Sequence, residues 1–433
     1  MDLALPFGPK KITFEVPFPP GNLAIARRCP VPLACEWDDL AARALGTPIG
    51  AEALADMHLQ GKSACVVIDR SVRRSVRRAA GEAADRMLPA VIDQLEKAKA
   101  RKITILAAWD DAPAPEPRPR PSHALRKKHA WEEHDPFAAN HRFYGFSTLG
   151  TPIFINGTVG DSDFRVAVGT VLPHVSHGYT GGYDALLPGA ASFECIARNR
   201  ALVFSPNSSY GHLGTNPCRL DLENAGAAAR LDFILDFVVA LDGSPLAAFA
   251  GHPIKAHRAA VNFGDRMVWG AELGGLADAA IASPGDRPGD APFDPRAIDF
   301  VAGGVKPRGS NIYLANPGPV PLPEDEFELE LHAMTILELA QLHEKRDWSG
   351  DNQEILGSLL AIEAAFFARR PFYHRNVILV GSDLSTRELA RLGASQVSTI
   401  KEAVEILVDL HGPAARVGLV PDAATTLCLP EFH

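Results

Sequence analysis

Hydrophobic residues in the first part of the chain alternate between strand-like and helix-like spacing. ACVVID, from Ala64, is a short β-branched run and predicts a buried strand. Segment 71–98 predicts a helix, and KITILAAW, from Lys102, predicts a second strand. The helix is indicated by apolar residues at helical spacing, namely Val72, Val76, Ala79, Ala80, Ala83 and Met87. This strand–helix–strand unit predicts a parallel sheet with a right-handed crossover.

Three more strands are expected before residue 245. TPIFIN (151–156) and FRVAVGTVLP (164–173) are strand-like, and the second runs directly into His174. LDFILDFVVALDG (231–243) alternates in part, so we expect a sheet with one face more exposed. APAPEPRPRP (112–121) predicts an extended loop, because proline fixes φ and removes hydrogen-bond donors.

The composition changes sharply at SPGDRPGDAPFDP (283–295), which we interpret as an interdomain connection. Beyond it, strand-like and helix-like segments alternate, as in NVILVGSD followed by STRELARLGA. We therefore predict an N-terminal α/β domain over 1–280, a linker over 281–295 and a smaller C-terminal α/β domain over 296–433. The predicted fold has two domains, each with a mainly parallel sheet flanked by helices, and an active site in the cleft between them.

Composition and charge restrict the class of partner. With 46% hydrophobic and 22% charged residues, the chain is an ordinary globular one. A net charge of -9 argues against nucleic acid or an anionic membrane as partner, so we expect a small molecule. The six cysteines show no metal-binding or disulfide spacing, which favours buried thiols in a reducing compartment. No secretory signal or 18-residue apolar stretch is visible, so a cytoplasmic location is expected.

The segment with the most chemical potential is LPHVSHGYTGGYDALLPG, from Leu172 to Gly189. His174 and His177 follow a strand end, where open α/β sheets place their ligands. Gly178, Gly181 and Gly182 then break the chain, and glycines of this kind let backbone approach a ligand closely. The alternative is a tight strand-to-helix turn that carries surface histidines.

This segment resembles the signature of the nickel-dependent lactate racemases, in its proline–histidine, its glycine pair and its LPG ending. The likeness extends to YGFSTLGTPIFINGTVGDSDFRVAVGTVLPH and SFECIARNR, to VVID upstream, and to AGGVKPRGSNIYLAN downstream. The resemblance implies a nickel-pincer nucleotide that takes a hydride from Cα of a 2-hydroxy acid and returns it to the other face. It also implies two acid/base histidines, one of which falls on His174.

At other positions the sequence departs from the family pattern. The lysine that tethers the family's cofactor falls on Asp184, so a nickel-pincer nucleotide would be held noncovalently. The nickel-binding histidine falls on Arg200, which cannot bind a cation. Asp110 and Asp111 stand where the second acid/base histidine is expected, and the late substrate-binding glutamine and lysine fall near Leu314 and Pro317. These changes indicate a rebuilt site or lost chemistry, and a substrate other than lactate.

The resemblance also suggests supporting residues. Asp69 matches an early family aspartate, and its arginine partner falls on Val72 or, with a slip of one residue, on Arg73. We expect Asp69 and Arg73 to support His174, and His177, Gly181, Gly182, Asp184 and Arg200 to line the cofactor site. An Asp184–Arg200 ion pair is a further hypothesis. His177 and His212 are the candidates to replace the missing nickel ligand.

Two groups of residues have a simpler interpretation beside the functional one. Arginines at helical spacing (Arg70, Arg73, Arg74, Arg77 and Arg78) form either an anion site or a solvated helix face, and we prefer the solvated face except for Arg70 and Arg73. Other loop histidines (His123, His129, His134 and His141) are expected to be structural.

The leading function is therefore a 2-hydroxy acid racemase or epimerase. The alternatives are a cofactor-independent enzyme in which His174 and His177 move a proton, and a silent binder of hydroxy acids or nucleotides.

Overall fold

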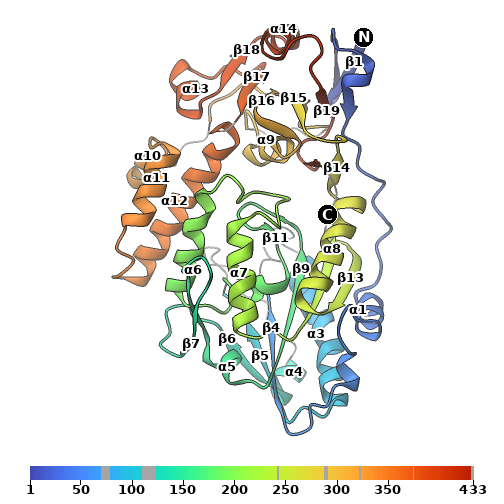
Figure 1. Ribbon diagram of the computed structural model, residues 1–433, viewed down its shortest axis with the longest axis vertical. Helices are drawn as coiled ribbons and strands as arrows, with labels where there is room; N and C mark the ends of the chain where they lie inside the picture. Colours follow the sequence, from blue (N-terminus) through green and yellow to red (C-terminus); the bar gives the residue numbers. More distant parts are fainter. Residues whose placement is uncertain are drawn as a thin grey trace. The chain divides into compact units, whose positions relative to one another are not determined.

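The computed structural model describes residues 1–69, 79–109, 123–240, 243–286, 291–320, 323–373 and 375–430 (Figure 1). The chain forms two compact domains. The central domain is Val31–Gly264, and the terminal domain combines Met1–Pro30 with Asp265–His433. Two α/β domains with mainly parallel sheets were predicted from the sequence, and this fold class is confirmed.

The domain boundaries differ from the predicted ones. The chain changes domain near residues 30 and 264, not in the proline-rich stretch 281–295. That stretch follows β15 (Ala277–Ala282), an interior strand of the terminal domain, and leads into α9 (Pro295–Ala302) of the same domain. Proline and glycine therefore mark a loop inside the domain here, and residues 287–290 lie outside the described part of the chain.

The central domain contains a six-stranded sheet in the order β13-β12-β9-β4-β5-β6. Adjacent strands are parallel except for β13, which is antiparallel to β12. Its strands are β4 (Ser63–Ile68), β5 (Lys102–Ala107), β6 (Ala130–Glu133), β9 (Phe164–Val171), β12 (Phe233–Val239) and β13 (Pro245–Gly251). A separate hairpin joins β7 (His141–Phe146) to β8 (Pro152–Asn156).

The helices of the central domain cover this sheet, so its middle strands are buried. They are α1 (Trp37–Gly46), α3 (Ala79–Lys97), α4 (His123–Lys128), α5 (Gly157–Asp161), α6 (Phe193–Arg200), α7 (Pro217–Ala228) and α8 (Pro253–Met267), whose last residues belong to the terminal domain. All seven residues of β12 are buried, so the prediction of a more exposed face there was wrong. Helix α1 covers this strand, with Trp37 packed on Phe237 at 5.3 Å between ring centres.

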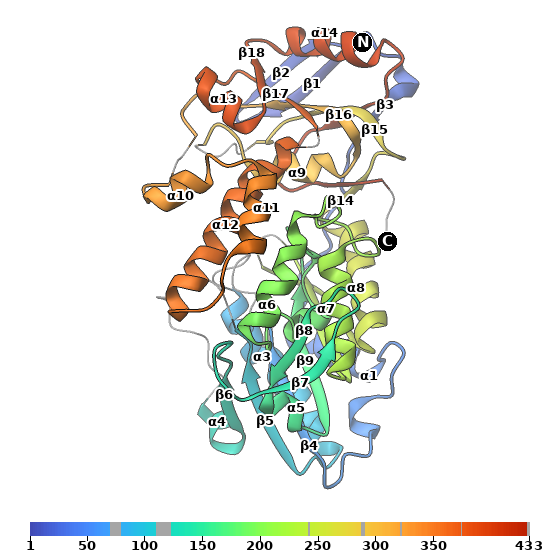
Figure 2. The same ribbon diagram turned by 60° about the vertical axis from the view of Figure 1, so that its left-hand side comes forward.

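The terminal domain has a fully parallel sheet in the order β18-β17-β16-β15-β19-β3. These strands, besides β15, are β3 (Leu23–Ile25), β16 (Val305–Leu314), β17 (Asn376–Val380), β18 (Ser395–Val397) and β19 (Val417–Val420). One face packs on the hairpin of β1 (Asp2–Phe7) and β2 (Lys10–Glu15) and on α14 (Ile400–His411), and α9 packs on the other (Figure 2).

The remaining helices of this domain are α10 (Glu326–Leu331), α11 (Ile336–Lys345), α12 (Asn352–Tyr373) and α13 (Thr386–Leu392), and a short pair joins β14 (Gly270–Glu272) to β20 (Leu427–Leu429). Among the residues that the structure describes, no helix is long and apolar enough to cross a membrane.

The strand order of the central sheet defines where a ligand is expected. From β4 the chain continues to β5 and β6 on one side, whereas β9 and β12 lie on the other side of β4. The order therefore reverses between β4 and β9, and open α/β sheets bind ligands outside the carboxyl ends of the strands at such a point. Asp69 directly follows β4 here, and the histidine segment follows β9.

Candidate active site

The segment after β9 folds back on itself as a small hairpin, which we call the histidine turn (residues 172–189). Its two short strands are β10 (Pro173–His174) and β11 (Gly178–Tyr179), followed by a 3-10 helix, η3 (Gly182–Ala185). Gly178 has a φ of +83°, and a Cβ there would lie 2.0 Å from the carbonyl oxygen of His212. The space that this glycine leaves is therefore filled by the chain itself.

Gly181 and Gly182 were predicted to let a cofactor approach, and both have positive φ. A Cβ on Gly181 would lie 2.9 Å from Oδ2 of Asp236. A Cβ on Gly182 would lie 3.2 Å from both Arg219 and His257. The atoms nearest to both glycines are thus protein groups, and their role towards a cofactor stays a prediction.

His174 and His177 stack on each other, with ring centres 3.8 Å apart and an interplanar angle of 16°. The Ser176 amide donates to Nδ1 of His174 at 3.3 Å, and the Ser176 hydroxyl lies 3.1 Å from the same nitrogen. Because an amide N–H can only donate, Nδ1 holds a lone pair and the neutral ring of His174 carries its proton on Nε2.

His177 has the opposite arrangement. Its Nδ1 lies 2.9 Å from the Tyr179 carbonyl oxygen, which can only accept, so the lone pair is on Nε2. Burial lowers the pKa of His177 well below its usual value, and the nearby His174 and Arg219 lower it further. The stacked pair therefore offers one N–H donor and one nitrogen lone pair at neutral pH.

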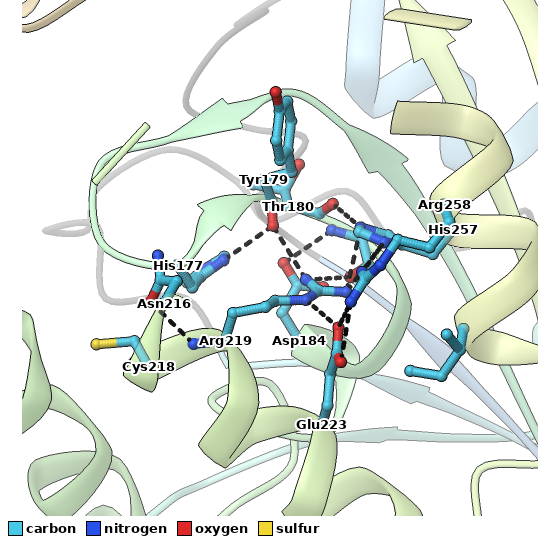
Figure 3. Close-up of polar contacts among 12 residues, drawn as sticks. His177, Tyr179, Thr180, Asp184, Asn216, Cys218, Arg219, Glu223, His257 and Arg258 are labelled. Atoms are coloured by element: carbon cyan, nitrogen blue, oxygen red, sulfur yellow. Dashed lines mark hydrogen bonds and ion pairs between the residues drawn. The ribbon is translucent and has the colours of Figure 1, made fainter. Parts of the chain in front are cut away.

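Helix α7 holds the histidine turn in place (Figure 3). The Asn216 side chain caps this helix and also donates to the Ser176 carbonyl at 2.9 Å. Arg219 is fully buried and donates to the Tyr179 and Gly181 carbonyls at 3.1 and 3.3 Å. One turn of helix thus fixes three carbonyl groups of the histidine turn.

Helix α8 completes this support. His257 is fully buried, and its Nε2 donates to the Thr180 carbonyl at 2.9 Å. Glu223 pairs with Arg219 at 2.5 Å and with Arg258 at 2.8 Å, so it links α7 to α8 (Figure 3). Burial, followed by the charges of Arg219 and Arg258, lowers the pKa of His257 well below its usual value, so this ring is a neutral structural group.

Three buried carboxyl groups, one of them within the histidine turn, interact with one another. Asp69 and Asp236 flank Gly169, and a Cβ on Gly169 would lie 3.4 Å from Oδ2 of Asp69 and 3.3 Å from Oδ1 of Asp236. Asp184, on η3, accepts from the Gly181 amide at 2.9 Å with Oδ2. Its Oδ1 and both oxygens of Asp236 are buried without a hydrogen-bond partner in the described residues. We call Asp69, Asp184 and Asp236 the carboxyl cluster.

Burial decides the protonation of this cluster. Desolvation raises the pKa of Asp236 to about 7, and the charge of Asp69 adds to the shift. Desolvation, followed by the charge of Asp69, raises the pKa of Asp184 well above its usual value. Arg219 acts in the opposite direction on both groups but does not outweigh burial. At least part of the cluster therefore holds protons at neutral pH.

We predict that Asp236→Asn changes how stability depends on pH. Between about pH 4 and pH 7 the folded protein keeps a proton on Asp236 that the unfolded chain has released, so this group lowers the free energy of unfolding by roughly 4 kcal/mol across that range. The variant lacks this loss, so the difference in free energy of unfolding between variant and wild type should grow from pH 4 to 7. Urea unfolding measures it, with exposed Asp39→Asn as control, and a difference independent of pH contradicts the assignment.

The Asp184–Arg200 ion pair that we expected is not formed. Oδ2 of Asp184 accepts a hydrogen bond from the Gly181 amide. Within the described residues, no hydrogen bond joins Asp184 to Arg200. The guanidinium of Arg200 lies instead over the ring of Trp109, 5.8 Å from its centre. Asp184 is accommodated by protonation rather than by a counterion, since burial raises its pKa.

The remaining predictions concern the arginines of 70–78, the proline-rich loop and the loop histidines. Arg73, the other arginines of 70–78, Asp110, Asp111 and the loop 112–121 lie outside the described residues. His134 is structural, as expected, because Nε2 donates to the Ala191 carbonyl at 2.8 Å and Asn156 donates to Nδ1. His129 pairs with Glu96 at 3.0 Å, and His141 packs against the ring of His134. The side chain of His123 is not among those described.

The expectation of buried thiols holds for four of the six free cysteines, Cys65, Cys195, Cys218 and Cys428. Cys29 is exposed and Cys35 is partly buried.

The supporting residues on α7 and α8 were not found from the sequence. Arg219, Glu223 and His257 lie 30 to 68 residues beyond the end of the histidine turn, and no local motif marks them. Asp236 could have been found, because a lone carboxylate inside the apolar run FILDFVV signals a buried polar group.

A metal or tethered cofactor can be tested against these residues. Among the residues that the structure describes, no group of three or more His, Cys, Asp or Glu side chains is placed to hold a metal ion. The carboxyl group of Asp184 cannot form the covalent link that a lysine makes. The guanidinium of Arg200 stays protonated and cannot bind a metal ion. His177 has the Nε2 lone pair that a single metal–imidazole bond needs.

Together, the fold and the site define a two-domain α/β protein with a stacked histidine pair at a topological switch point. Residues 7–211 match the family model described as the lactate racemase N-terminal domain. The lactate racemase of Thermoanaerobacterium thermosaccharolyticum is 24% identical over an alignment that covers 98% of this chain and 99% of that protein. The lactate racemase of Lactiplantibacillus plantarum is also 24% identical, over 63% of each chain.

Solved structures agree on the fold. The lactate racemase apoprotein from Thermoanaerobacterium thermosaccharolyticum has a TM-score of 0.65 at 22% identity, and the match covers 99% of this chain and 100% of that one. A protein from Thermotoga maritima has a TM-score of 0.52 at 14% identity, over 92% and 99% of the two chains. The chain is therefore lactate racemase-like and divergent from these relatives, and it is a racemase-like enzyme of the isomerase class.

Proposed function

We propose that the protein racemises or epimerises a small 2-hydroxy acid at the carboxyl edge of β4 and β9. The observation that carries this proposal is the histidine pair, which stands at the switch point of the sheet and offers a proton donor beside a proton acceptor. A 2-hydroxy acid presents oxygen atoms, in its hydroxyl and its carboxylate, that a ring N–H can bind. That the site lies between the two domains stays a prediction.

His174 is the acid/base group in this proposal. In its resting form the ring donates from Nε2 to a substrate oxygen. To take up the substrate's hydroxyl proton at Nε2, the ring must first change to the tautomer with its proton on Nδ1, in which the Ser176 hydroxyl at 3.1 Å would accept from Nδ1 in place of the amide contact. The imidazolium that forms when the ring takes up this proton then returns it to the substrate oxygen from Nε2.

The stacking of the rings bears on the cofactor-independent alternative. Moving a proton between the two faces of Cα requires a base on each face, with the substrate between them. Rings whose centres are 3.8 Å apart leave no space for a substrate, so His174 and His177 cannot act as opposed bases in this arrangement. This geometry favours a mechanism in which something other than His177 receives the hydrogen of Cα.

The family resemblance implies a nickel-pincer nucleotide, which would supply the capacity to accept a hydride if it is bound here. The covalently tethered form does not fit Asp184, so a noncovalently held group is proposed. His177 is the described residue best suited to give it an imidazole ligand, because its Nε2 keeps a lone pair and its pKa stays low. His174 then handles only the hydroxyl proton, which is the chemistry its hydrogen bonds support.

Mass spectrometry tests how the cofactor is held. Protein produced together with the cofactor-synthesis enzymes should contain nickel by elemental analysis and show an added mass under native conditions. Under denaturing conditions only the mass of the polypeptide should remain, because a carboxyl side chain cannot form the family's covalent link. The lactate racemase of Thermoanaerobacterium thermosaccharolyticum, treated identically, is the reference. Protein free of nickel, or an adduct that survives denaturation, contradicts this part of the proposal.

A further inference from the structure

The terminal domain contains a cavity of about 740 Å³ in which every charged lining residue is an arginine. Four arginines line it, Arg308, Arg369, Arg375 and Arg391, and its lining includes no acidic residue. We call it the arginine cavity. The whole chain carries a net charge of -9, so four guanidinium groups in one cavity run against the overall balance of charge.

The arginine cavity lies at the amino edge of the terminal sheet. Asn376 is the first residue of β17, and it pairs with Ser310 near the start of β16. The family's substrate-binding positions fall near Leu314 and Pro317, at the other end of β16. Four residues of extended strand, or roughly 13 Å, separate Ser310 from Leu314, so this cavity lies at the opposite end of the β16–β17 ladder from those positions.

A bulge in β16 positions the first arginine. Pairing with β15 passes from Ala277↔Val305 to Ala279↔Ser310, so residues 306–309 are looped out of the ladder. Arg308, in this bulge, has a φ of +64°, a left-handed conformation that is strained for a side chain of this size. It has no hydrogen-bond or ion-pair partner among the described residues. The bulge thus holds a strained, uncompensated cation at the cavity.

The other three arginines also keep unused donors. Arg391, on α13, has no hydrogen-bond partner in the described part of the chain. Arg375 donates from Nη2 to the Val305 carbonyl at 3.0 Å, but its Nε is buried and unpartnered there. Arg369 donates to the carbonyls of Met334 and His332 and receives no carboxylate.

Arg369 and Arg391 repel each other in this cavity. Burial lowers the pKa of Arg369, and the charge of Arg391 lowers it further. Burial also lowers the pKa of Arg375. A bound anion would relieve the repulsion and fill the free donors, and the planar guanidinium fork matches phosphate oxygens.

The apolar surroundings narrow the class of ligand. Ile336, Phe372 and Leu392 line the arginine cavity beside the guanidinium groups. A second cavity of about 260 Å³ shares Arg369, Arg391 and Leu392, and Phe293 and Val320 contribute to its walls. A volume of this order suits a small molecule, and a concave site suits a compact ligand better than a nucleic-acid duplex.

We propose that the arginine cavity binds a phosphorylated small molecule of nucleotide size, with its phosphates on the arginines and its apolar body on Ile336, Phe372 and Leu392. Several cations in one site favour a ligand with more than one negative charge, which distinguishes a phosphate ester from a simple carboxylate. The described residues that line the cavity all belong to the terminal domain, and the proposal does not depend on the proposed racemase activity.

Calorimetric titration of the full chain with pyrophosphate, AMP and ATP tests this site. Wild-type protein should bind at least one of these probes at a single site. The double variant Arg308→Ala/Arg391→Ala should bind it at least tenfold more weakly, because each guanidinium contributes charge-assisted hydrogen bonds. Arg387→Ala, an exposed residue on the same helix as Arg391 that lines neither cavity, should bind it as the wild type does.

Two further variants separate this site from other effects. Arg308→Gly removes the strained side chain, so it should melt at a higher temperature than wild type and yet bind the probe more weakly. His174→Gln should leave binding unchanged, which separates this cavity from the histidine turn. Absence of binding for all three probes, or equal binding by wild type, the double variant and Arg387→Ala, overturns the proposal.

Discussion

Replacing His174 with glutamine should lower the rate of racemisation by about three orders of magnitude. A positioned general acid/base contributes about 10²- to 10⁴-fold, and glutamine keeps the size and hydrogen-bonding capacity of the ring but cannot exchange a proton near neutral pH. The histidine is partly exposed and its ring nitrogen contacts Ser176, so the fold should tolerate the change. The effect is measured as the steady-state kcat on the 2-hydroxy acid that the wild-type protein converts fastest among several tested.

The matched control is His58→Gln, an exposed histidine of the same domain that should retain full activity. Equal melting temperatures for both variants and the wild type would show that the loss is chemical rather than structural. A His174→Gln protein with wild-type kcat would remove His174 from the reaction.

Arg219→Met should destabilise the protein by about 3–5 kcal/mol, the second large effect that we expect. Arg219 is fully buried, and its removal leaves the Tyr179 and Gly181 carbonyls without this donor and Glu223 with only Arg258. Breaking a buried, hydrogen-bonded ion pair on one side costs about this much, because Glu223 loses one of its two cations and the buried carbonyls lose a charged donor. The loss of the cation should also push the pKa values of Asp184 and Asp236 higher.

Urea unfolding at pH 7 measures this change in the free energy of unfolding. The control is Arg198→Met, an exposed arginine on α6, which should change stability by less than about 0.5 kcal/mol. If Arg219→Met lowers the free energy of unfolding by less than about 1 kcal/mol, the side chains of α7 and α8 do not hold the histidine turn as described.

The sequence predicted the strands and the location of the histidine segment because both depend on local patterns. A short β-branched apolar run is typical of a buried strand in a sheet covered on both faces, and β4 and β9 are such strands. The carboxyl end of β9 then places His174 at the edge of the sheet without further information.

The predictions that failed depended on which residues and strands are neighbours in the folded protein. The proline-rich stretch 283–295 has the composition of a linker, but composition does not show that β15 before it pairs with β16 after it. Asp184 and Arg200 were paired on charge alone, whereas desolvation lets a buried carboxyl keep its proton instead. Arg219 and His257 reach the site from helices whose packing no local pattern reveals.

The carboxyl cluster gives the divergence from the lactate racemases a physical meaning. The resemblance places a lysine at position 184, and a cation there would lie beside Asp69 and Asp236. With Asp184 instead, three carboxyl groups share one buried region, and protons replace the missing cation. We propose that the central domain keeps the fold of the lactate racemases but lacks, at Asp184, the group to which the resemblance implies that their cofactor is attached.

Chiral chromatography of single-enantiomer 2-hydroxy acids, incubated with nickel-loaded protein, tests the central claim most directly. We predict that at least one acid of a panel with varied side chains is converted to its other configuration, and that His174→Gln protein with the same nickel content does not convert it. Nickel-loaded wild-type protein that leaves every acid of the panel in its starting configuration would contradict the assignment as a 2-hydroxy acid racemase.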